Sequence, residues 1–211
     1  IDHEHPDLVC LQEVDRLVKR SSFDDQPRLL GESLNLRSHF QSNVPVATGT
    51  YGNLILSRWP VASAHRISLK RGKRKSRGAQ LVHIETPHGV LHLVNTHLGL
   101  DERERHWQMS YLLQHQLFQS YATLPTLIAG DFNDWRNTLA NASLATKGFQ
   151  QLTSPPAQFR SFPSWLPVGG LDKVFVSEGM QSHQARVIQT SLAREASDHL
   201  PVVVDFTIST S

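Results

Sequence analysis

Residues 126–133 are Thr-Leu-Ile-Ala-Gly-Asp-Phe-Asn, an apolar run that ends in an acid and an amide. A short apolar run followed by turn-forming residues predicts a buried β-strand over Thr126–Asp131. A carboxylate at the end of such a strand is costly to remove from water unless it is paired or binds a cation. Asp131 and Asn133 are therefore the first candidates for a functional site.

The same arrangement of apolar strands with polar ends recurs along the chain. Strands are predicted at Leu8–Glu13, Asn53–Ser57, Gln80–Glu85, Val90–His97, Thr126–Asp131, Leu171–Ser177 and Pro201–Thr207. One polar strand end means little, because Asp is a good turn former. The further polar ends are Glu13, His97, Asp172 and Asp198-His199. If these ends converge, they form a site of hard oxygen ligands beside two imidazoles, which favours Mg²⁺ or Mn²⁺ over Zn²⁺.

Few helices are predicted between these strands. Asp101–Tyr121 has apolar residues at helical spacing and a capping box formed by Asp101 and Glu104. Shorter helices are expected at Asp25–Leu34 and Asn137–Ala145. Strands with helices set between them favour a layered α+β domain over a regular βαβ repeat. No loop is long enough to separate two domains, so we expect one domain over residues 1–211.

The composition limits the classes of protein to be considered. The chain has 211 residues, of which 39% are hydrophobic and 19% charged, as in globular proteins. No apolar run reaches the roughly 18–20 residues of a membrane-spanning helix. The single cysteine, Cys10, excludes an internal disulfide and favours a cytoplasmic location. A net charge of +2 does not exclude nucleic acid as a partner, because a local basic patch matters more than the total.

Five motifs, taken in order, resemble those of the endonuclease/exonuclease/phosphatase superfamily, which includes deoxyribonuclease I and neutral sphingomyelinases. They are Leu11-Gln12-Glu13-Val14, Asn95-Thr96-His97-Leu98, Gly130-Asp131-Phe132-Asn133, Leu171-Asp172-Lys173-Val174-Phe175-Val176 and Ser197-Asp198-His199-Leu200-Pro201. The resemblance implies a four-layer α/β sandwich, in which two packed, mostly antiparallel sheets are flanked by helices. It also implies a phosphoester hydrolase that acts as a monomer with Mg²⁺ or Mn²⁺.

One feature departs from the family pattern. Members usually carry a metal-proximal asparagine on a first strand upstream of the glutamate motif. This chain begins about a dozen residues before Glu13, so nothing in it can supply that asparagine. We therefore expect a domain that lacks its first strand, with upstream residues of the native protein as the explanation.

The resemblance assigns the metal and the base. Glu13 and Asp198 are expected to bind the divalent ion, and Asp198 is also expected to orient His199. Asp131 and Asn133 would position the attacking water and the phosphate, or hold a second ion. His199 would accept the proton of that water as a general base.

The remaining roles concern the transition state and the substrate. His97 would donate a hydrogen bond to a phosphoryl oxygen, and Asp172 would help to orient His97 or polarise the site. Asn53, Arg77 and Asn95 are expected to contact the substrate.

Two segments bear on the substrate. Residues 66–77 carry seven cations and no acid, which suits a loop that binds a polyanion or a solvated hairpin tip. The loop Ser154–Gly170 contains Phe159, Phe162 and Trp165, whose wall would stack on a base, contact a lipid or simply pack.

Three functions remain open at this stage. The favoured one is a metal-dependent phosphodiesterase acting on nucleic acid. The second is a phosphodiesterase or phosphatase acting on a lipid or a small phosphoester. The third is a non-catalytic module that binds polyanions, although such a module has no need of a positioned base and a metal ligand.

Overall fold

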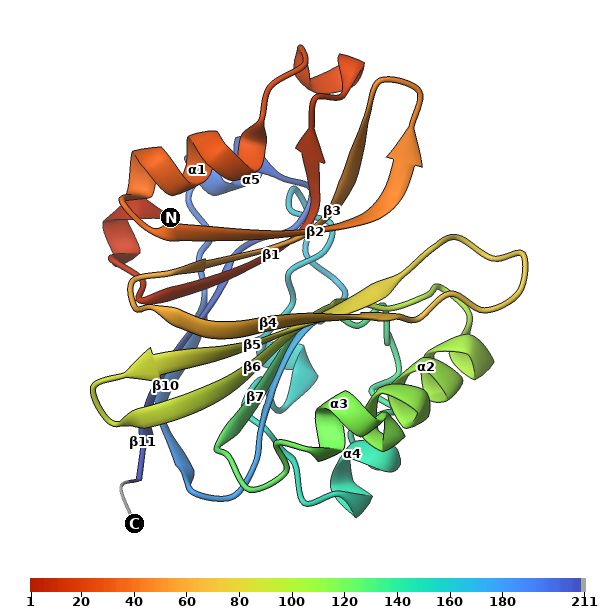
Figure 1. The fold of residues 1–211 in the computed structure, drawn as a ribbon, viewed down its shortest axis with the longest axis vertical. Helices are drawn as coiled ribbons and strands as arrows, with labels where there is room; N and C mark the ends of the chain where they lie inside the picture. The colour runs from red at the N-terminus through yellow and green to blue at the C-terminus, as the bar shows by residue number, and fades with distance from the viewer. Residues whose placement is uncertain (210–211) are drawn as a thin grey trace.

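The strands form two central layers, and helices cover both outer faces (Figure 1). The computed structural model describes residues 1–209. The strands are β1 (Leu8–Arg16), β2 (Arg37–Val46), β3 (Gly49–Ser57), β4 (Val61–Ser68), β5 (Gly78–Thr86), β6 (Gly89–His97), β7 (Thr126–Asp131), β8 (Gln150–Gln151), β9 (Asp172–Val176), β10 (Met180–Val187) and β11 (Val202–Ile208). The helices are α1 (Gln26–Leu34), α2 (Glu102–Gln114), α3 (Gln116–Gln119), α4 (Ser143–Thr146) and α5 (Ser191–Ala196), with short 3₁₀ turns at Asp2–Glu4, Lys19–Ser21 and Pro156–Gln158.

One layer is a six-stranded sheet with the order β4-β5-β6-β7-β9-β8. The other consists of a three-stranded sheet, β1-β3-β2, and the antiparallel pair β10-β11. Helix α1 packs outside the three-stranded sheet, whereas α2, α3 and α4 lie on the far face of the six-stranded sheet (Figure 1). The four-layer α/β sandwich predicted from the sequence is confirmed, with one of its two sheet layers divided into two parts.

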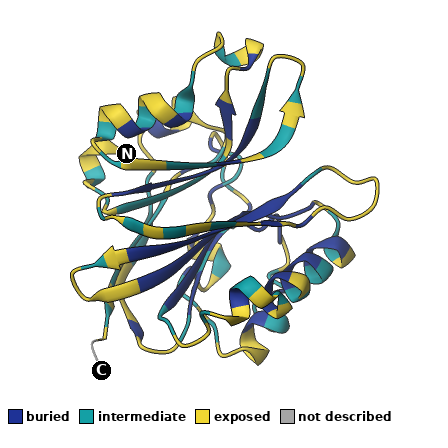
Figure 2. Ribbon diagram, viewed as in Figure 1, coloured by how far each residue is buried: buried dark blue, intermediate teal, exposed yellow. Residues whose placement is uncertain are grey.

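Three apolar clusters hold the layers together (Figure 2). The first, with Leu81, Ile128 and Phe132, lies between the six-stranded sheet and the helices α2 to α4. The second fills the space between the sheet layers, and the third joins the three-stranded sheet to α1. Because β5, β6 and β7 are buried on both faces, their sequences are nearly continuous apolar runs. Within residues 1–209, no helix is long and apolar enough to cross a membrane.

The strand pairing in the six-stranded sheet brings several candidate residues to one edge. Strands β6 and β7 are parallel, with His97 opposite Asp131. Strand β9 runs antiparallel to β7 and begins with Asp172, also opposite Asp131. The carboxyl ends of β6 and β7 therefore meet the amino end of β9.

Two helix predictions differ from the structure. The helix predicted at Asp101–Tyr121 is interrupted at His115, whose extended backbone ends α2 and whose Nδ1 caps α3 by accepting from the Leu117 amide. The helix predicted at Asn137–Ala145 is wrong, because only α4 forms there. The carboxylate of Asp134 accepts a hydrogen bond from the Leu139 amide and holds this segment as a turn.

Candidate active site

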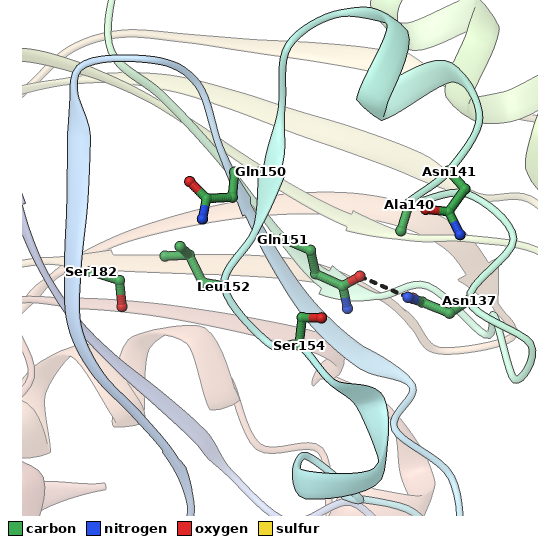
Figure 3. A pocket seen from close by; sticks show the side chains of 8 residues that line it. All are labelled: Asn137, Ala140, Asn141, Gln150, Gln151, Leu152, Ser154 and Ser182. Carbon is green, nitrogen blue, oxygen red and sulfur yellow. Dashed lines mark hydrogen bonds between the residues drawn. The ribbon is translucent and has the colours of Figure 1, made fainter.

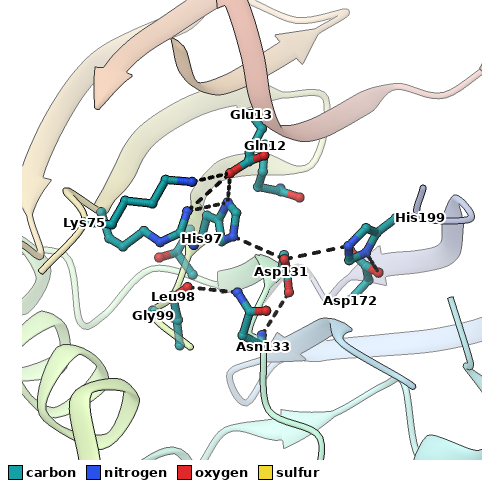
Figure 4. Close-up of polar contacts among 12 residues, drawn as sticks. Gln12, Glu13, Lys75, His97, Leu98, Gly99, Asp131, Asn133, Asp172 and His199 are labelled. Carbon is teal, nitrogen blue, oxygen red and sulfur yellow. Dashed lines mark hydrogen bonds and ion pairs between the residues drawn. The ribbon is translucent and has the colours of Figure 1, made fainter. Parts of the chain in front are cut away.

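The polar strand ends converge around the carboxylate of Asp131 (Figure 4). Its Oδ2 lies 3.2 Å from Nε2 of His97 and 4.0 Å from Nε2 of His199. Its Oδ1 accepts a hydrogen bond of 2.9 Å from the backbone amide of Asn133. The sequence prediction that these four residues lie together therefore agrees with the geometry.

Glu13 reaches the site through an irregularity in β1. The pairing of β1 with β3 shifts register between Leu11 and Val14, so the strand continues to Arg16 through a bulge. Glu13 has a φ of +55°, a left-handed conformation that is uncommon for a residue with a side chain. Strained backbone of this kind occurs preferentially at functional sites. The bulge directs the half-exposed Glu13 carboxylate to within 4.0 Å of Nδ1 of His97.

His97 is held as a neutral hydrogen-bond donor. The Arg77 guanidinium donates to its Nδ1 at 3.1 Å, which leaves the ring proton on Nε2, the atom that faces Asp131. Burial, followed by the positive charges of Arg77 and Lys75, lowers the pKa of His97 to about 2. His97 can thus donate a hydrogen bond, but it does not carry charge at neutral pH.

Asp131 is buried next to a second carboxylate. Burial, and then the negative charge of Asp172, raises the pKa of Asp131 to about 7, although the charge of His199 acts in the opposite direction. A carboxyl group that titrates near neutral pH can accept or release a proton during a reaction.

His199 is oriented by Asp172. Its Nδ1 donates a hydrogen bond of 2.8 Å to Oδ2 of Asp172, which also accepts from the Ser161 hydroxyl. Burial lowers the pKa of His199, but the hydrogen bond to Asp172 and the charges of Asp172 and Asp131 outweigh this effect and raise it to about 9. The arrangement leaves Nε2 of His199 free to face Asp131 or a reacting group.

Two predicted roles are corrected by this contact. Asp198 does not orient His199, because its carboxylate is exposed and makes no hydrogen bond or ion pair within residues 1–209. Asp172 does not orient His97, because its Oδ2 is engaged by His199. The expectation that Asp198 binds metal stays a prediction.

Asn133 completes the loop that follows β7. It has a φ of +50°, and its Nδ2 donates to the carbonyl oxygen of Leu98 at 3.0 Å. This hydrogen bond ties the loop after β7 to the loop after β6 and fixes the amide beside Asp131.

Asn95 and Asn53 do not reach the site surface, and this burial weighs against the expectation that they contact substrate. Asn95 is fully buried, and its Nδ2 donates to the carbonyl oxygens of Leu11 and Leu54. Its Oδ1 accepts from Nε2 of Gln12 at 2.7 Å. Asn53 is only 1% exposed and donates to two backbone carbonyls. Both asparagines join strands of the two sheet layers.

The basic loop, residues 69–77 between β4 and β5, lies against the site at one end and against α2 at the other. Lys75 Nζ lies 3.0 Å from Oε1 of Glu13, and NH1 of Arg77 lies 3.6 Å from the same atom. Arg74 pairs with the buried Glu104 at 3.0 Å. The sequence prediction named Arg77 as a substrate contact and placed Lys75 only among the cations of the basic segment, because nothing local indicates that Lys75 lies beside Glu13.

The same loop uses other cations away from the site. Arg71 lies over the ring of Trp107 and donates to the carbonyl oxygen of Arg103. Arg74 also lies 3.4 Å from Asp101. Asp101 caps α2 as predicted, accepting from the Glu104 amide at 2.9 Å, whereas the Glu104 side chain binds Arg74 in place of closing the capping box.

The donor set suits a water-rich magnesium site. No three His, Cys, Asp or Glu side chains among the described residues converge as a ready-made metal cage. Mg²⁺ is commonly held by one or two carboxylates and keeps several waters, so it does not require such a cage. The half-exposed carboxylate of Glu13, with no thiolate near it, fits this pattern, and two cations lie beside it.

The most evident surface hollow lies elsewhere. It measures about 510 Å³ and is lined by Asn137, Ala140, Asn141, Gln150, Gln151, Leu152, Ser154 and Ser182 (Figure 3). None of these side chains titrates, and none belongs to the cluster around Asp131, so the hollow carries no evident chemistry.

The aromatic wall predicted in the loop Ser154–Gly170 forms in part. Phe159 is buried, and Phe162 lies against the ring of His199 with 4.8 Å between ring centroids. Trp165 is 72% exposed.

Known proteins share this fold and sequence pattern. The model of the endonuclease/exonuclease/phosphatase family matches residues 1–199. The uncharacterized protein YbhP of Escherichia coli is 29% identical over 210 residues, which span 93% of this chain and 81% of YbhP. An endonuclease/exonuclease/phosphatase structure from Beutenbergia cavernae has a TM-score of 0.82 at 24% identity and covers 99% of this chain, which spans 64% of it. The human Nocturnin catalytic domain with a bound sulfate anion has a TM-score of 0.74 at 24% identity, over 98% of this chain and 82% of its own.

The chain belongs to the endonuclease/exonuclease/phosphatase family. Members of this family hydrolyse phosphoester bonds in nucleic acids or small molecules and are generally dependent on a divalent metal.

Proposed function

We propose that this protein is a Mg²⁺-dependent phosphodiesterase whose favoured substrate is a nucleic acid. The observation that carries the proposal is the pair of imidazoles on either side of Asp131, one held neutral by Arg77 and the other held by Asp172. A purely structural role does not require one histidine with a lowered pKa and another with a raised pKa to face the same buried carboxylate.

His199 and Asp131 are proposed to move the proton of the attacking water. Asp172 holds Nδ1 of His199, so proton transfer takes place at Nε2, which faces Asp131 at 4.0 Å. The reaction needs the unprotonated imidazole, because a general base must accept a proton. The backbone amide of Asn133 and Nε2 of His97 fix the carboxylate of Asp131 in its position.

Glu13 is the proposed metal ligand on this chain, with Asp198 as a further candidate. A bound divalent ion supplies positive charge that stabilises the developing negative charge of the phosphoryl group. Arg77 and Lys75 lie beside Glu13 and provide positive charge for a substrate phosphate. Neutral His97 donates a hydrogen bond from Nε2, which faces Asp131. A phosphoryl oxygen of the substrate can replace the Asp131 carboxylate as the acceptor of that hydrogen bond.

The test is hydrolysis of plasmid DNA, an abasic duplex, bis-p-nitrophenyl phosphate and a phospholipid, each with Mg²⁺ and with chelator. We expect metal-dependent cleavage that falls at least about 100-fold in His199→Ala, with an unchanged circular dichroism spectrum. If none of the four substrates is hydrolysed in Mg²⁺ or Mn²⁺, the proposal is wrong.

A smaller phosphoester is the second candidate. Arg71 and Arg74 are bound to α2, so the basic loop offers fewer cations to a polyanion than its sequence suggests. The salt dependence of DNA binding separates the two substrates. In a plot of the logarithm of the binding constant against the logarithm of the salt concentration, each duplex phosphate contact adds roughly 0.9 to the steepness of the slope. A steepness of about one or less corresponds to a single phosphate contact and favours the small substrate.

A further inference from the structure

Trp135 is a large apolar side chain that the loop after β7 holds at the surface beside the site. It follows Asn133 by two positions, and 55% of it is exposed. Its ring packs on the backbone of Gly169, where an added Cβ would lie 2.7 Å from Cζ3 of the indole. Phe162 meets it edge to face, with 6.0 Å between ring centroids and an interplanar angle of 83°. The indole is therefore fixed from behind while much of it stays in contact with solvent.

A single ring separates Trp135 from His199. Phe162 contacts the indole on one side and the imidazole of His199 on the other, at 4.8 Å between centroids. Phe162 is itself fixed, because its backbone pairs with that of Gly169 through reciprocal hydrogen bonds of 2.8 and 3.1 Å. The aromatic row of Trp135, Phe162 and His199 thus runs from solvent to the reacting groups.

The cations of the site lie on the opposite side of Asp131. Lys75 and Arg77 surround Glu13 and His97, whereas the aromatic row begins at His199. A ligand that spans the site meets positive charge at one end and a flat ring at the other. A nucleotide unit has this chemistry, since its phosphate and its planar base are joined by one sugar.

The surroundings of Trp135 suit a base better than an acyl chain. Of the two residues on either side of it, Asp134 is fully buried, whereas Arg136 is well exposed and lies 3.5 Å from Glu102 at the surface. An acyl chain gains most from an enclosed apolar groove, whereas a base gains from one flat face with polar groups around it.

We propose that Trp135 is a stacking platform for the nucleobase next to the scissile phosphate, which makes it a specificity-determining residue. This inference rests on the proposed phosphodiesterase function and names its substrate class. Loss of base stacking on an aromatic side chain weakens binding by about five- to 150-fold per base.

The test compares substrates that release the same leaving group. Thymidine 5′-(p-nitrophenyl phosphate), methyl p-nitrophenyl phosphate and octyl p-nitrophenyl phosphate differ only in the group that remains on phosphorus. We expect the wild-type protein to prefer the thymidine ester over the methyl ester in kcat/KM. Trp135→Ala should reduce that preference at least about fivefold, and Trp135→Phe should retain part of it. Trp165→Ala, which removes a more exposed tryptophan of the neighbouring hairpin, is the matched control and should leave the ratio unchanged.

A binding measurement keeps the inference independent of turnover. By calorimetry, Trp135→Ala should weaken binding of thymidine 5′-monophosphate at least about fivefold relative to the wild type and Trp165→Ala. If the wild type hydrolyses none of the three esters, the assay of the four substrates above decides on the proposed function, and the calorimetry alone decides on the platform. An unchanged ester ratio with unchanged nucleotide affinity overturns the platform. Equal losses on the octyl and thymidine esters also overturn it, because they indicate a general apolar contact.

Discussion

The Nδ1 atom of His199 and Oδ2 of Asp172 lie 2.8 Å apart, although 27 positions separate the two residues in the chain. The contact joins the amino end of β9 to the segment before β11 and fixes which nitrogen of His199 faces the reacting groups. It also accounts for the high pKa of His199, because the hydrogen bond and the negative charge of Asp172 outweigh the effect of burial.

The first prediction concerns this pair. Asp172→Asn should lower the pKa of His199 from about 9 toward its ordinary value, because burial then acts with less opposition. It should also lower kcat at least about 100-fold through loss of orientation. Titration of the imidazole by NMR checks the shift. Asp198→Asn is the matched control, since this carboxylate acts on His199 without a hydrogen bond in the described residues, and a shift of similar size there would contradict the assignment.

The second prediction concerns Asp131, whose pKa is raised from 3.8 to about 7. Between these two values the folded protein binds a proton that the unfolded chain releases, so the free energy of unfolding falls as pH rises from about 4 to 7. Asp131→Asn should remove this loss and stabilise the protein at pH 8 by on the order of 2 kcal/mol, while activity is lost. Urea unfolding at pH 5 and pH 8 measures the difference. If the free energy of unfolding changes with pH in the same way in the wild type and in Asp131→Asn, the buried carboxylate is not destabilising.

The third prediction concerns Lys75, whose ammonium forms an ion pair of 3.0 Å with the carboxylate of Glu13. A divalent ion at Glu13 must displace this contact, so Lys75→Met should raise the affinity for Mn²⁺ by roughly tenfold through lost competition and repulsion. Calorimetric titration of the metal without substrate gives the affinity. Lys73→Met removes an exposed cation of the same loop and should change the affinity much less. Weaker Mn²⁺ binding in Lys75→Met would mean that Lys75 supports the metal site.

The fourth prediction concerns Gly130, which precedes Asp131. It has a φ of +142°, and an added Cβ would lie 1.9 Å from the carbonyl oxygen of Thr96 on β6. Gly130→Ala should therefore destabilise the fold by about 3 kcal/mol or more, since neither backbone can move without breaking the pairing of β6 with β7. Gly72→Ala, at a φ of +57° with open space around the added Cβ, should cost only about 1 kcal/mol. Urea unfolding of both variants makes the comparison, and similar costs would refute the steric argument.

The sequence predicted which strands carry the site, because each apolar run with a polar end is a local pattern. It could not predict which carboxylate orients His199. Asp198 is adjacent to His199 in sequence, but its carboxylate is exposed and makes no hydrogen bond to the imidazole. Asp172 reaches His199 only through the register of β9 against β7. That register depends on packing between distant segments.

Asn95 shows a second limit of sequence reasoning. It shares a sheet face with His97, two positions later, so the alternation of side chains suggests that both line the site. The structure places Asn95 beneath β1 and β3, where other strands cover it. The alternation of side chains along a strand predicts on which face of the sheet a residue lies. It does not predict how much of that face the neighbouring layer covers.

The buried amide of Asn95 also sets the thickness of the sandwich beside the site. Gln12, which binds Oδ1 of Asn95, directly precedes Glu13 on one layer, while His97 follows Asn95 by two residues on the other. The distance between the carboxylate of Glu13 and the imidazole of His97 therefore depends on the contact that the Asn95 side chain makes with Gln12. A displacement of about 1 Å in such a geometry can reduce a rate by roughly 100-fold. A slight separation of the two sheet layers at Asn95 would therefore disturb the proposed active site while each sheet remains fully formed.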